Sequence, residues 1–538
     1  MPRTLALVLA LLLATPGCGG GSSSPDAAPP PPVDYAIVAA DALAASAARY
    51  RDFRAGDGHQ VDLALTSAVV GDATDVATAS ARLHDHVQAL YDARDPGRPF
   101  FLLLLGDAQT EWPGDGTGVP TGTWTDPSTA APVTSDNVYA DLNGDDIPEL
   151  AVGRITADSD AEADQVREKV AAYESPREVG PWDRRLNVFA STSGYGEPAD
   201  SIIEGLAFDI VESVPYDYDV TMTYARQASP YVYVPEEFSD QVYHRINEGA
   251  LLVAYIGHGY TGGFATLSWS GVSYPILDTA HLENIAVTHK TPILLFVACS
   301  TGAFDGAESV SERILVGADA PSAILSSTEE SDPYANAIFV YESAQAFTAL
   351  RAPTVGEAFV LAKQRMLGND DSVRQQIDAV AAYISTPTQE DALKHSHEHM
   401  YTLFGDPAMA VVYAGVSTDV TVTGAATPGT DLAVTASLPG IGAGGQAVVT
   451  LESPRQTILG ALAAVPADGD PLRDGVIRQN YATANDKVAA SVTVPLTGPT
   501  LATSITVPAD LPAGTYHVKV LASDASGDVI GSTTITVP

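Results

Sequence analysis

The sequence has few cysteines and few positive charges. Its 538 residues include only two cysteines, Cys18 and Cys299, which excludes a fold held together by a disulfide framework. Lys and Arg number 27 against 67 Asp and Glu, so the formal net charge is −40. Sequence-independent nucleic-acid binding relies on Lys and Arg to neutralise phosphates, so this balance argues against a nucleic-acid partner. The many carboxylates are instead suitable ligands for calcium.

Long apolar runs are also scarce. The run from Leu5 to Ala14 is too short to span a bilayer, and no segment after Pro32 is long and apolar enough to do so. Because this run follows Arg3 and precedes Cys18, residues 1–18 resemble a bacterial lipoprotein signal. The resemblance implies lipidation of Cys18, export to the outer membrane or cell surface, and no other membrane attachment. An ordinary cleaved signal and a secreted protein are the alternative.

The length of the chain and the changes in its composition and hydrophobic pattern predict several domains. Residues 19–33 are rich in Gly, Ser and Pro and predict a tether. Residues 34–416 then alternate apolar runs with helical patterns, as expected of strands buried on both faces of a mainly parallel sheet. We therefore predict an α/β fold with a doubly wound, mainly parallel sheet in two halves, residues 34–182 and 183–416.

The composition and the hydrophobic pattern of the sequence change after about residue 416. Thr, Val, Ala and Gly dominate, and polar and apolar residues alternate, as in residues 419–423. Turn signals recur between these short segments. Residues 417–538 are therefore predicted to form a small, all-β, immunoglobulin-like sandwich.

Two predicted strands of the α/β region end in reactive side chains. Residues 251–256 lead into His258, and residues 292–298 lead into Cys299. If the two strands are neighbours and parallel, both side chains emerge at the same sheet edge, where ligands bind in open α/β sheets. A thiol needs a nearby base to attack well, and His258 can act as that base near neutral pH. The backbone amides of Gly259 and Cys299 could together form an oxyanion hole.

These residues also allow other interpretations. A single buried cysteine at a strand end is usually an inert core residue. A serine hydrolase is excluded because the sequence has no G-x-S-x-G turn.

Four groups of motifs resemble, in order, those of the gingipain family of cysteine peptidases, which share a caspase-like fold. They are residues 101–109, residues 135–139 with 149–154, residues 255–259 with 297–300, and residues 404–408. The resemblance implies a cysteine endopeptidase that acts on proteins or peptides without a cofactor for its chemistry. It assigns Cys299 as the nucleophile, His258 as the base and Glu149 as the acidic residue that orients His258. It also assigns the amides of Gly259 and Cys299 as the oxyanion donors.

A segment just before Glu149 has the alternating oxygen ligands of a calcium loop. Asp141, Asn143 and Asp145 are the candidate side-chain ligands, and Ile147 offers its carbonyl. The loop departs from an EF-hand because Asp146 replaces the glycine and no Glu occupies the twelfth position. An acidic surface turn is the alternative. Calcium binding among gingipains favours a structural calcium ion.

Substrate preference is harder to predict. Gingipains accept Arg or Lys before the cut, which requires an acidic pocket, and Asp160 lies near the position of the pocket residue. Ser159 to Glu162 also form a helix start, where acidic residues favour the helix dipole, and this interpretation is the preferred one. Rival pocket residues follow the nucleophile: Asp305, Glu329, Glu330 and Asp332.

Three alternate histidines near the end of the α/β region, His395, His397 and His399, resemble a metal cluster. No zinc-site spacing completes them, and strand and helix are equally compatible with this segment. We interpret it mostly as solvated.

Two other functions are compatible with the sequence. One is a transpeptidase or sorting enzyme of the same fold, which would transfer the acyl group to an amine. The other is a non-catalytic surface adhesin, which the tether and the predicted sandwich would suit.

Overall fold

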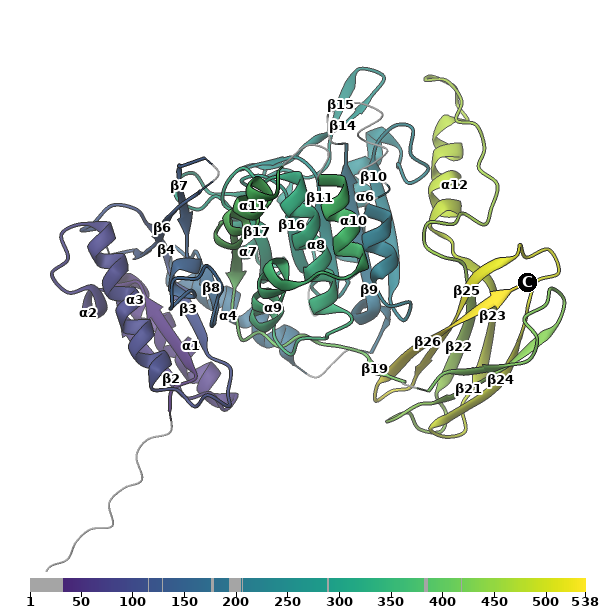
Figure 1. The fold of residues 1–538 in the computed structure, drawn as a ribbon, viewed down its shortest axis with the longest axis horizontal. Coiled ribbons are helices and arrows are strands. Elements are labelled where there is room, and N and C mark those ends of the chain that lie inside the picture. The colour runs from purple at the N-terminus through teal and green to yellow at the C-terminus, as the bar shows by residue number, and fades with distance from the viewer. Residues whose placement is uncertain are drawn as a thin grey trace, which may run out of the picture.

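The computed structural model describes residues 32–538 except 115, 128, 176–178, 193–204, 206, 288–289, 382–385 and 418. The predicted signal, including Cys18, lies outside these residues. No helix among the described residues is long and apolar enough to cross a membrane. Figure 1 shows an α/β body followed by a separate β-sandwich.

A ten-stranded sheet forms the centre of the α/β body, in the order β10-β9-β11-β16-β17-β18-β8-β3-β1-β2. The first five strands are parallel to one another: β10 (Asp219–Ala225), β9 (Arg185–Ser191), β11 (Leu252–Ile256), β16 (Ile293–Val297) and β17 (Ala323–Ser327). The other five are also mutually parallel: β18 (Tyr401–Gly405), β8 (Ala151–Ile155), β3 (Phe101–Leu105), β1 (Tyr35–Ala39) and β2 (Val61–Leu65). Strands β17 and β18 are antiparallel, so the two blocks run in opposite directions.

This arrangement confirms the predicted mainly parallel sheet and adds a relationship between its halves. The carboxyl ends of the first block share an edge with the amino ends of the second. Strand β18 comes from residues 183–416 but pairs with β8 from residues 34–182. The sheet therefore continues without a break across the predicted seam.

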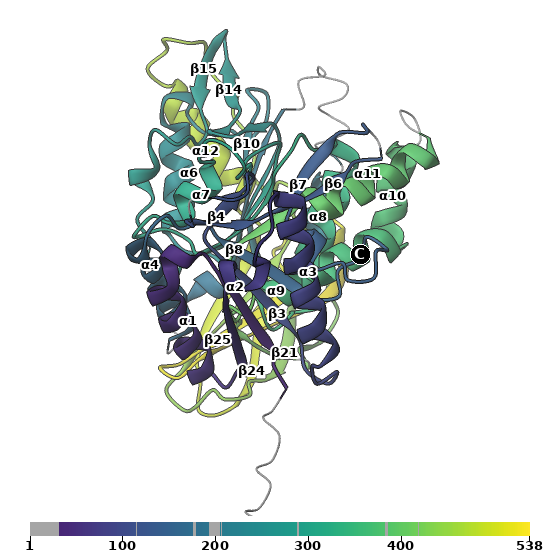
Figure 2. The same ribbon diagram turned by 90° about the vertical axis from the view of Figure 1, so that its left-hand side faces the viewer.

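Successive residues of a strand point to opposite sides, so a wholly apolar strand presents apolar side chains on both faces of the sheet. Helices cover both faces. In β16, Leu294 and Phe296 pack into one core and Leu295 and Val297 into another. Figure 2 shows α1, α4 and α6 on one side of the sheet and α8, α10 and α11 on the other. The α-helices of the α/β body whose bounds lie within the described residues are α1 (Ala44–Gly56), α2 (Thr66–Val70), α3 (Val76–Asp92), α4 (Asp160–Glu174), α6 (Phe238–Asn247), α7 (Val310–Leu315), α8 (Pro333–Phe347), α9 (Val355–Gly368), α10 (Ser372–Ala381) and α11 (Pro387–Met400).

Short strand pairs form in the segments that connect the elements of the large sheet. They are β4 (Asp107–Gln109) with β5 (Gly118–Pro120), β6 (Gly122–Thr125) with β7 (Pro132–Ser135), β12 (Gly259–Tyr260) with β13 (Gly263–Phe264), and β14 (Thr266–Trp269) with β15 (Val272–Pro275). The last two pairs extend directly from the segment that contains His258.

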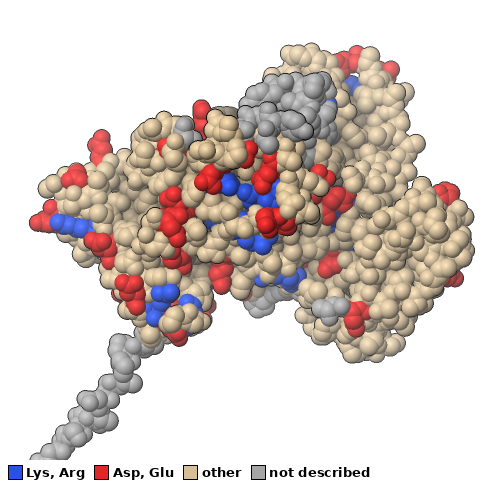
Figure 3. Space-filling model, viewed as in Figure 1, with Lys and Arg blue, Asp and Glu red and all other residues tan. Residues whose placement is uncertain are grey.

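The C-terminal region forms two β-sheets around a core of its own. One has the order β19-β26-β25-β22-β23 and the other β20-β21-β24. These strands are β19 (Gly415–Val416), β20 (Thr421–Thr423), β21 (Asp431–Ser437), β22 (Gln446–Glu452), β23 (Val488–Pro495), β24 (Thr500–Thr506), β25 (Gly514–Ser523) and β26 (Asp528–Val537). On the face shown in Figure 3, Asp and Glu side chains are spread over the α/β body, and few charged residues lie on the sandwich.

One helix of this region was not predicted. Helix α12 (Arg473–Asn485) lies between β22 and β23 in the chain and packs beside α6 of the α/β body (Figure 1). Its Tyr481 hydroxyl lies 2.8 Å from the Thr223 hydroxyl oxygen of β10. Its Arg473 guanidinium donates to Glu236 at 2.6 Å. The sandwich is thus joined to the α/β body by a buried contact as well as by the chain.

Candidate active site

The strand register brings His258 and Cys299 to the same edge of the sheet. Strands β11 and β16 are parallel neighbours in which Ile256 is the partner of Val297. The chain continues two residues beyond each partner, to His258 and to Cys299. Neighbouring strands lie about 4.8 Å apart, so the two backbones leave the sheet side by side.

The thiol of Cys299 is partly buried and contacts the chain that follows β17. The backbone amide of Ser331 donates to Cys299 Sγ at 3.3 Å, and the Ser331 hydroxyl oxygen lies 3.8 Å from the same sulfur. The side-chain amide of Asn336 donates to that hydroxyl at 2.8 Å. The hydroxyl of Tyr401 donates to Asn336 Oδ1 at 2.6 Å. A chain of hydrogen bonds therefore holds the segment beside the sulfur.

The turn after Cys299 and the backbone at Gly259 pack closely together. Ser300 has a left-handed φ of 53°, and its amide donates to the Glu329 carbonyl at 2.9 Å. A Cβ atom at Gly259 would lie 2.7 Å from Thr301 Cγ2 and 2.9 Å from the Cys299 carbonyl oxygen. Side chains essentially never approach backbone so closely, so only glycine fits at position 259. The absence of a side chain brings this backbone against the Cys299 turn.

The backbone of His258 is fixed by buried polar groups. Its amide donates to Ser191 Oγ at 3.4 Å, and its carbonyl accepts from the Tyr255 hydroxyl at 2.8 Å and from the Ala265 amide at 2.9 Å. The ring of Tyr255 stacks on Phe264, with centroids 3.6 Å apart. These contacts set the position of the His258 backbone before any substrate binds.

Helix α7 contacts both reactive loops. Its amino end is a capping box in which Ser309 accepts from the Glu312 amide and Glu312 accepts from the Ser309 amide. The amide of Val310 donates to the Thr261 carbonyl at 2.7 Å, and the amide of Ser311 donates to the Thr301 carbonyl at 3.2 Å. The loop after His258 and the loop after Cys299 are therefore held by one short helix.

Acidic side chains gather next to the Cys299 turn. Glu329 accepts from Ser300 through its carbonyl, and burial, Asp305 and Glu330 together raise the pKa of its carboxyl group. Asp305 accepts from the Thr134 hydroxyl at 2.6 Å. Asp332 has a different role, because its carboxylate caps α8 by accepting from the Tyr334 amide at 2.8 Å.

The structure does not bring Glu149 to His258. The register places Val297, Ser327, Tyr401 and Ala151 at one level, so Glu149 lies at the same edge as His258. It is, however, four strand positions away from β11, roughly 19 Å at the usual spacing. Its carboxylate accepts instead from the Leu142 amide at 2.7 Å and from the Asn143 side chain. The expectation that Glu149 orients His258 is therefore corrected.

Asp160 also lies away from the reactive residues. It follows the carboxyl end of β8, which is at the opposite edge of the sheet. Its carboxylate accepts from the backbone amide of Ser46 at 2.9 Å and from the Ser46 hydroxyl, and Arg49 lies 3.7 Å away. Ser159 caps the helix that begins there. The helix-start interpretation describes Asp160, and the pocket interpretation is corrected.

The predicted calcium loop folds around the carboxylate of Asp141. That carboxylate accepts from the Gly144 amide at 2.8 Å and from the Asp146 amide at 3.0 Å, and Asp145 accepts from the Ile147 amide at 3.0 Å. Carboxylate oxygens of Asp141, Asp145 and Glu149 lie within 4.8 Å of one another. Asn143 directs its amide nitrogen towards Glu149, so Glu149 joins the oxygen cluster.

The three histidines near the end of the α/β region lie on helix α11, and two of them are buried. His397 is 1% exposed and accepts from the Asp332 amide at 3.0 Å, and His399 is 2% exposed. Burial lowers the pKa of each of these two imidazoles to about 4. The expectation of a solvated segment is therefore wrong. A helix that packs against the sheet buries one of its sides, which the alternation of histidines did not indicate.

The chain is similar to one protein family and to several solved structures. The family model of peptidase family C25 matches residues 28–412. No curated protein matches the sequence. The crystal structure of the Arg-specific cysteine proteinase gingipain R (RgpB) is similar, with a TM-score of 0.51, 15% identity, and coverage of 94% of this chain and 98% of that one. A solved structure described as a protease has a TM-score of 0.52 and 16% identity, with coverage of 94% and 97%. A complex of the pro- and mature domains of RgpB from Porphyromonas gingivalis has a TM-score of 0.48 and 14% identity, with coverage of 94% and 100%.

Proposed function

This chain belongs to peptidase family C25, the gingipain-like cysteine peptidases, and on that premise we propose that it is an endopeptidase in which Cys299 and His258 form the catalytic dyad. A peptidase acts on proteins or peptides, so its substrate is a polypeptide. The observation that carries the dyad is the strand register. It pairs Ile256 with Val297, so the two strands lead into His258 and Cys299 at the same edge of the sheet, which supports the dyad.

The proposed reaction is acyl transfer through a thioester. His258 takes the proton from the Cys299 thiol, and the thiolate attacks the carbonyl carbon of the scissile peptide bond. The amides of Gly259 and Cys299 donate to the oxyanion, an assignment supported by the close approach of Gly259 to the Cys299 turn. His258 then gives its proton to the leaving amine, and water hydrolyses the thioester. Every group in this scheme is supplied by the chain, the substrate or water.

The first test is removal of the sulfur. A Cys299→Ala variant is expected to lose cleavage of a mixed peptide library, as read by mass spectrometry of the products. A His258→Ala variant should lose it as well and should slow alkylation of Cys299 by iodoacetamide at pH 7. A Cys299→Ala variant that cleaves as fast as the parent would overturn the proposal.

We propose that the acidic residues beside the thiol favour a basic residue before the cut. Asp305 and Glu329 are the candidates, supported by the contact of Glu329 with Ser300 and by the influence of Asp305 on Glu329. The Glu329→Gln and Asp305→Asn variants should lower kcat/KM for Arg or Lys substrates more than for neutral ones. Asp160→Asn is the matched control and should leave this preference unchanged. Equal preferences in all three variants would contradict the assignment.

We propose that the Asp141 loop holds a structural calcium ion through Asp141, Asp145 and Glu149. Hard oxygen ligands of this kind suit calcium, and the three carboxylates already lie within 4.8 Å of one another. Calcium should raise the thermal unfolding midpoint of chelator-treated protein, and Glu149→Gln should abolish that rise. An unchanged midpoint on calcium addition would contradict the site.

We propose further that the chain is exported and anchored by a lipid on Cys18, which lies outside the described residues. The sequence before Cys18 supports this proposal. In a bacterial host, the full-length protein should partition with membranes and release into buffer when Cys18 is changed to Ala. A parent protein that is already free in the buffer would contradict the anchor.

A further inference from the structure

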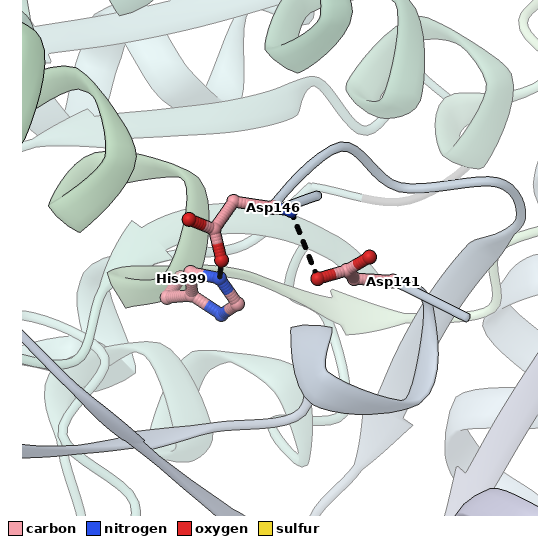
Figure 4. Close-up of side chains that lie close together, drawn as sticks. All are labelled: Asp141, Asp146 and His399. Atoms are coloured by element: carbon pink, nitrogen blue, oxygen red, sulfur yellow. Dashed lines mark hydrogen bonds and ion pairs between the residues drawn. The ribbon is translucent and has the colours of Figure 1, made fainter. Parts of the chain in front are cut away.

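Helix α11 places two histidines on one side, four residues apart, where both face the carboxylate of Asp146. His399 Nε2 lies 2.9 Å from Asp146 Oδ1, and His395 Nδ1 lies 3.1 Å from Asp146 Oδ2. A carboxylate oxygen of Asp141, the Asp146 oxygen and the His399 nitrogen all lie within 4.8 Å of one another. Figure 4 shows Asp141, Asp146 and His399 converging from the loop and the helix.

We infer that these residues bind a divalent transition-metal ion, with His399, Asp146 and Asp141 as ligands and His395 at the open side. The inference does not rest on the proposed peptidase function, because none of these residues belongs to the catalytic dyad. Two histidines four residues apart on a helix, together with carboxylates, are a ligand set that proteins use for zinc.

The position of the His399 ring is fixed in advance. Trp124 stacks on it with centroids 4.3 Å apart and planes 13° apart, and the Trp124 indole donates to Asp146 Oδ1 at 3.1 Å. The His399 side chain is 3% exposed, and its Nδ1 is buried without a hydrogen-bond partner among the described residues. A ring held on one face and directed at a carboxylate loses little freedom when a metal binds.

The spacing of the ligand atoms suits a small ion. Zinc ligands lie about 2.0–2.1 Å from the metal, so two atoms of a tetrahedral site are roughly 3.3 Å apart. The 2.9 Å between His399 Nε2 and Asp146 Oδ1 needs only a small outward movement, and Asp141 contributes an oxygen within 4.8 Å of both atoms. Asp146 and His395 are 30% and 27% exposed, so an ion can enter from solvent while His399 forms the buried wall.

The inferred site differs chemically from the calcium loop, although both use Asp141. The calcium ligands proposed above are all oxygens and include Asp145 and Glu149. The transition-metal site takes its nitrogen ligand from His399 of α11, with His395 at its open side. A metal here would join the Asp141 loop to His399 of α11. His399 lies two residues before Tyr401, whose hydroxyl supports the segment beside Cys299.

Zinc binding by the full chain tests the inference. The chain carries Cys299→Ala, so that the thiol cannot bind the metal, and is stripped with chelator and titrated with Zn²⁺ by calorimetry. We expect one Zn²⁺ per chain. His399→Gln, Asp146→Asn and His395→Ala should each weaken binding at least tenfold. His281→Gln is the matched control, because His281 also pairs with an aspartate, Asp278, at 2.8 Å, but on the surface, and should bind as the parent does.

The outcomes separate the two metal sites. Glu149→Gln should keep zinc binding while it removes the calcium effect. The inference is wrong if the parent binds no zinc, if His395→Ala and Asp146→Asn both bind as tightly as the parent, or if only Glu149→Gln loses the ion. If His399→Gln fails to fold, the zinc affinities of Asp146→Asn and His395→Ala, both at partly exposed positions, decide whether these residues bind the metal. Visible absorption of bound Co²⁺ in the parent and in these two variants gives a second readout.

Discussion

The backbone amide of Ser331 donates a hydrogen bond to the sulfur of Cys299 at 3.3 Å. Ser331 follows β17, the strand next to β16, so the thiol at the end of one strand is contacted by the chain leaving its neighbour. Asn336 of α8 and Tyr401 at the start of β18 complete the support through the Ser331 hydroxyl. These hydrogen bonds fix where Ser331 lies relative to the sulfur.

Loss of the Tyr401 hydroxyl should therefore affect the thiol at a distance. Tyr401→Phe leaves Asn336 Oδ1 without this donor and frees the Asn336 amide to move away from Ser331. We expect slower alkylation of Cys299 by iodoacetamide at pH 7 and a lower kcat, because the segment that contacts the sulfur is held less firmly. The stability cost of leaving a buried acceptor unpaired is about 1–3 kcal/mol.

Tyr50→Phe provides the control for that experiment. Its hydroxyl is also buried and donates to Asp406 at 2.8 Å, just beyond the carboxyl end of β18 and so at the sheet edge opposite Cys299. It should lower stability without changing the rate of Cys299 alkylation at pH 7. Equal alkylation rates for Tyr401→Phe and the parent would show that the network does not act on the thiol.

The close approach at Gly259 predicts a sharp response to one added methyl group. In Gly259→Ala, the new Cβ would lie 2.9 Å from the Cys299 carbonyl oxygen, so the Cys299 turn must move. Displacements of about 1 Å at a reacting group can cost about 100-fold in rate, and we expect a loss of this order in kcat/KM. In Gly262→Ala, the Cβ would come close to the ring of the exposed Tyr260, which can turn away, and would lie at an ordinary contact distance of 3.6 Å from Thr279 Oγ1. Similar activity in both variants would contradict this account.

Glu312 predicts a pH-dependent stability. Burial raises its pKa to about 7, whereas an unfolded chain gives Glu a value of about 4.3. The folded state thus holds this proton more tightly, and the stabilisation present below pH 4 is lost as the pH rises towards 7. Relative to Glu312→Gln, the parent should lose roughly 3 kcal/mol of unfolding free energy between pH 4.5 and pH 7.5. Urea unfolding at several pH values measures the difference, and parallel curves for the two proteins would contradict it.

The contact between α12 and the α/β body should contribute to stability. Tyr481→Phe removes a hydroxyl that lies 2.8 Å from Thr223 and within hydrogen-bond distance of Gln241 and Arg245. We expect a loss of about 1–3 kcal/mol and faster proteolysis of residues 454–487. Tyr516→Phe, whose hydroxyl donates only within the sandwich, to Pro512, should not change the proteolysis of that segment. Proteolysis at the parent rate in Tyr481→Phe would contradict a stabilising contact.

Apolar patterns predicted the strands well, because a strand buried on both faces requires an unbroken apolar run. The runs ending before His258 and Cys299 are strands β11 and β16, and the alternating region after residue 416 has two β-sheets. Helix α12 was missed, although its buried Ile477, Tyr481 and Ala484 follow a helical spacing. Helix α12 is short and lies between segments with strand patterns. Its buried side faces the α/β body, and the local sequence does not reveal that contact.

The sequence by itself determined which residues end the strands, and hence that His258 and Cys299 lie beyond two strand ends. Only the tertiary structure decided which strands are neighbours and in which direction each block runs. That order brings the strand ends that lead into His258 and Cys299 to one edge but leaves Glu149 four strands from β11. It also brings His399 against Asp146 across 253 positions of sequence. Local periodicity records whether a residue is buried. Which distant residues meet depends on the packing of whole elements, and no local pattern encodes that.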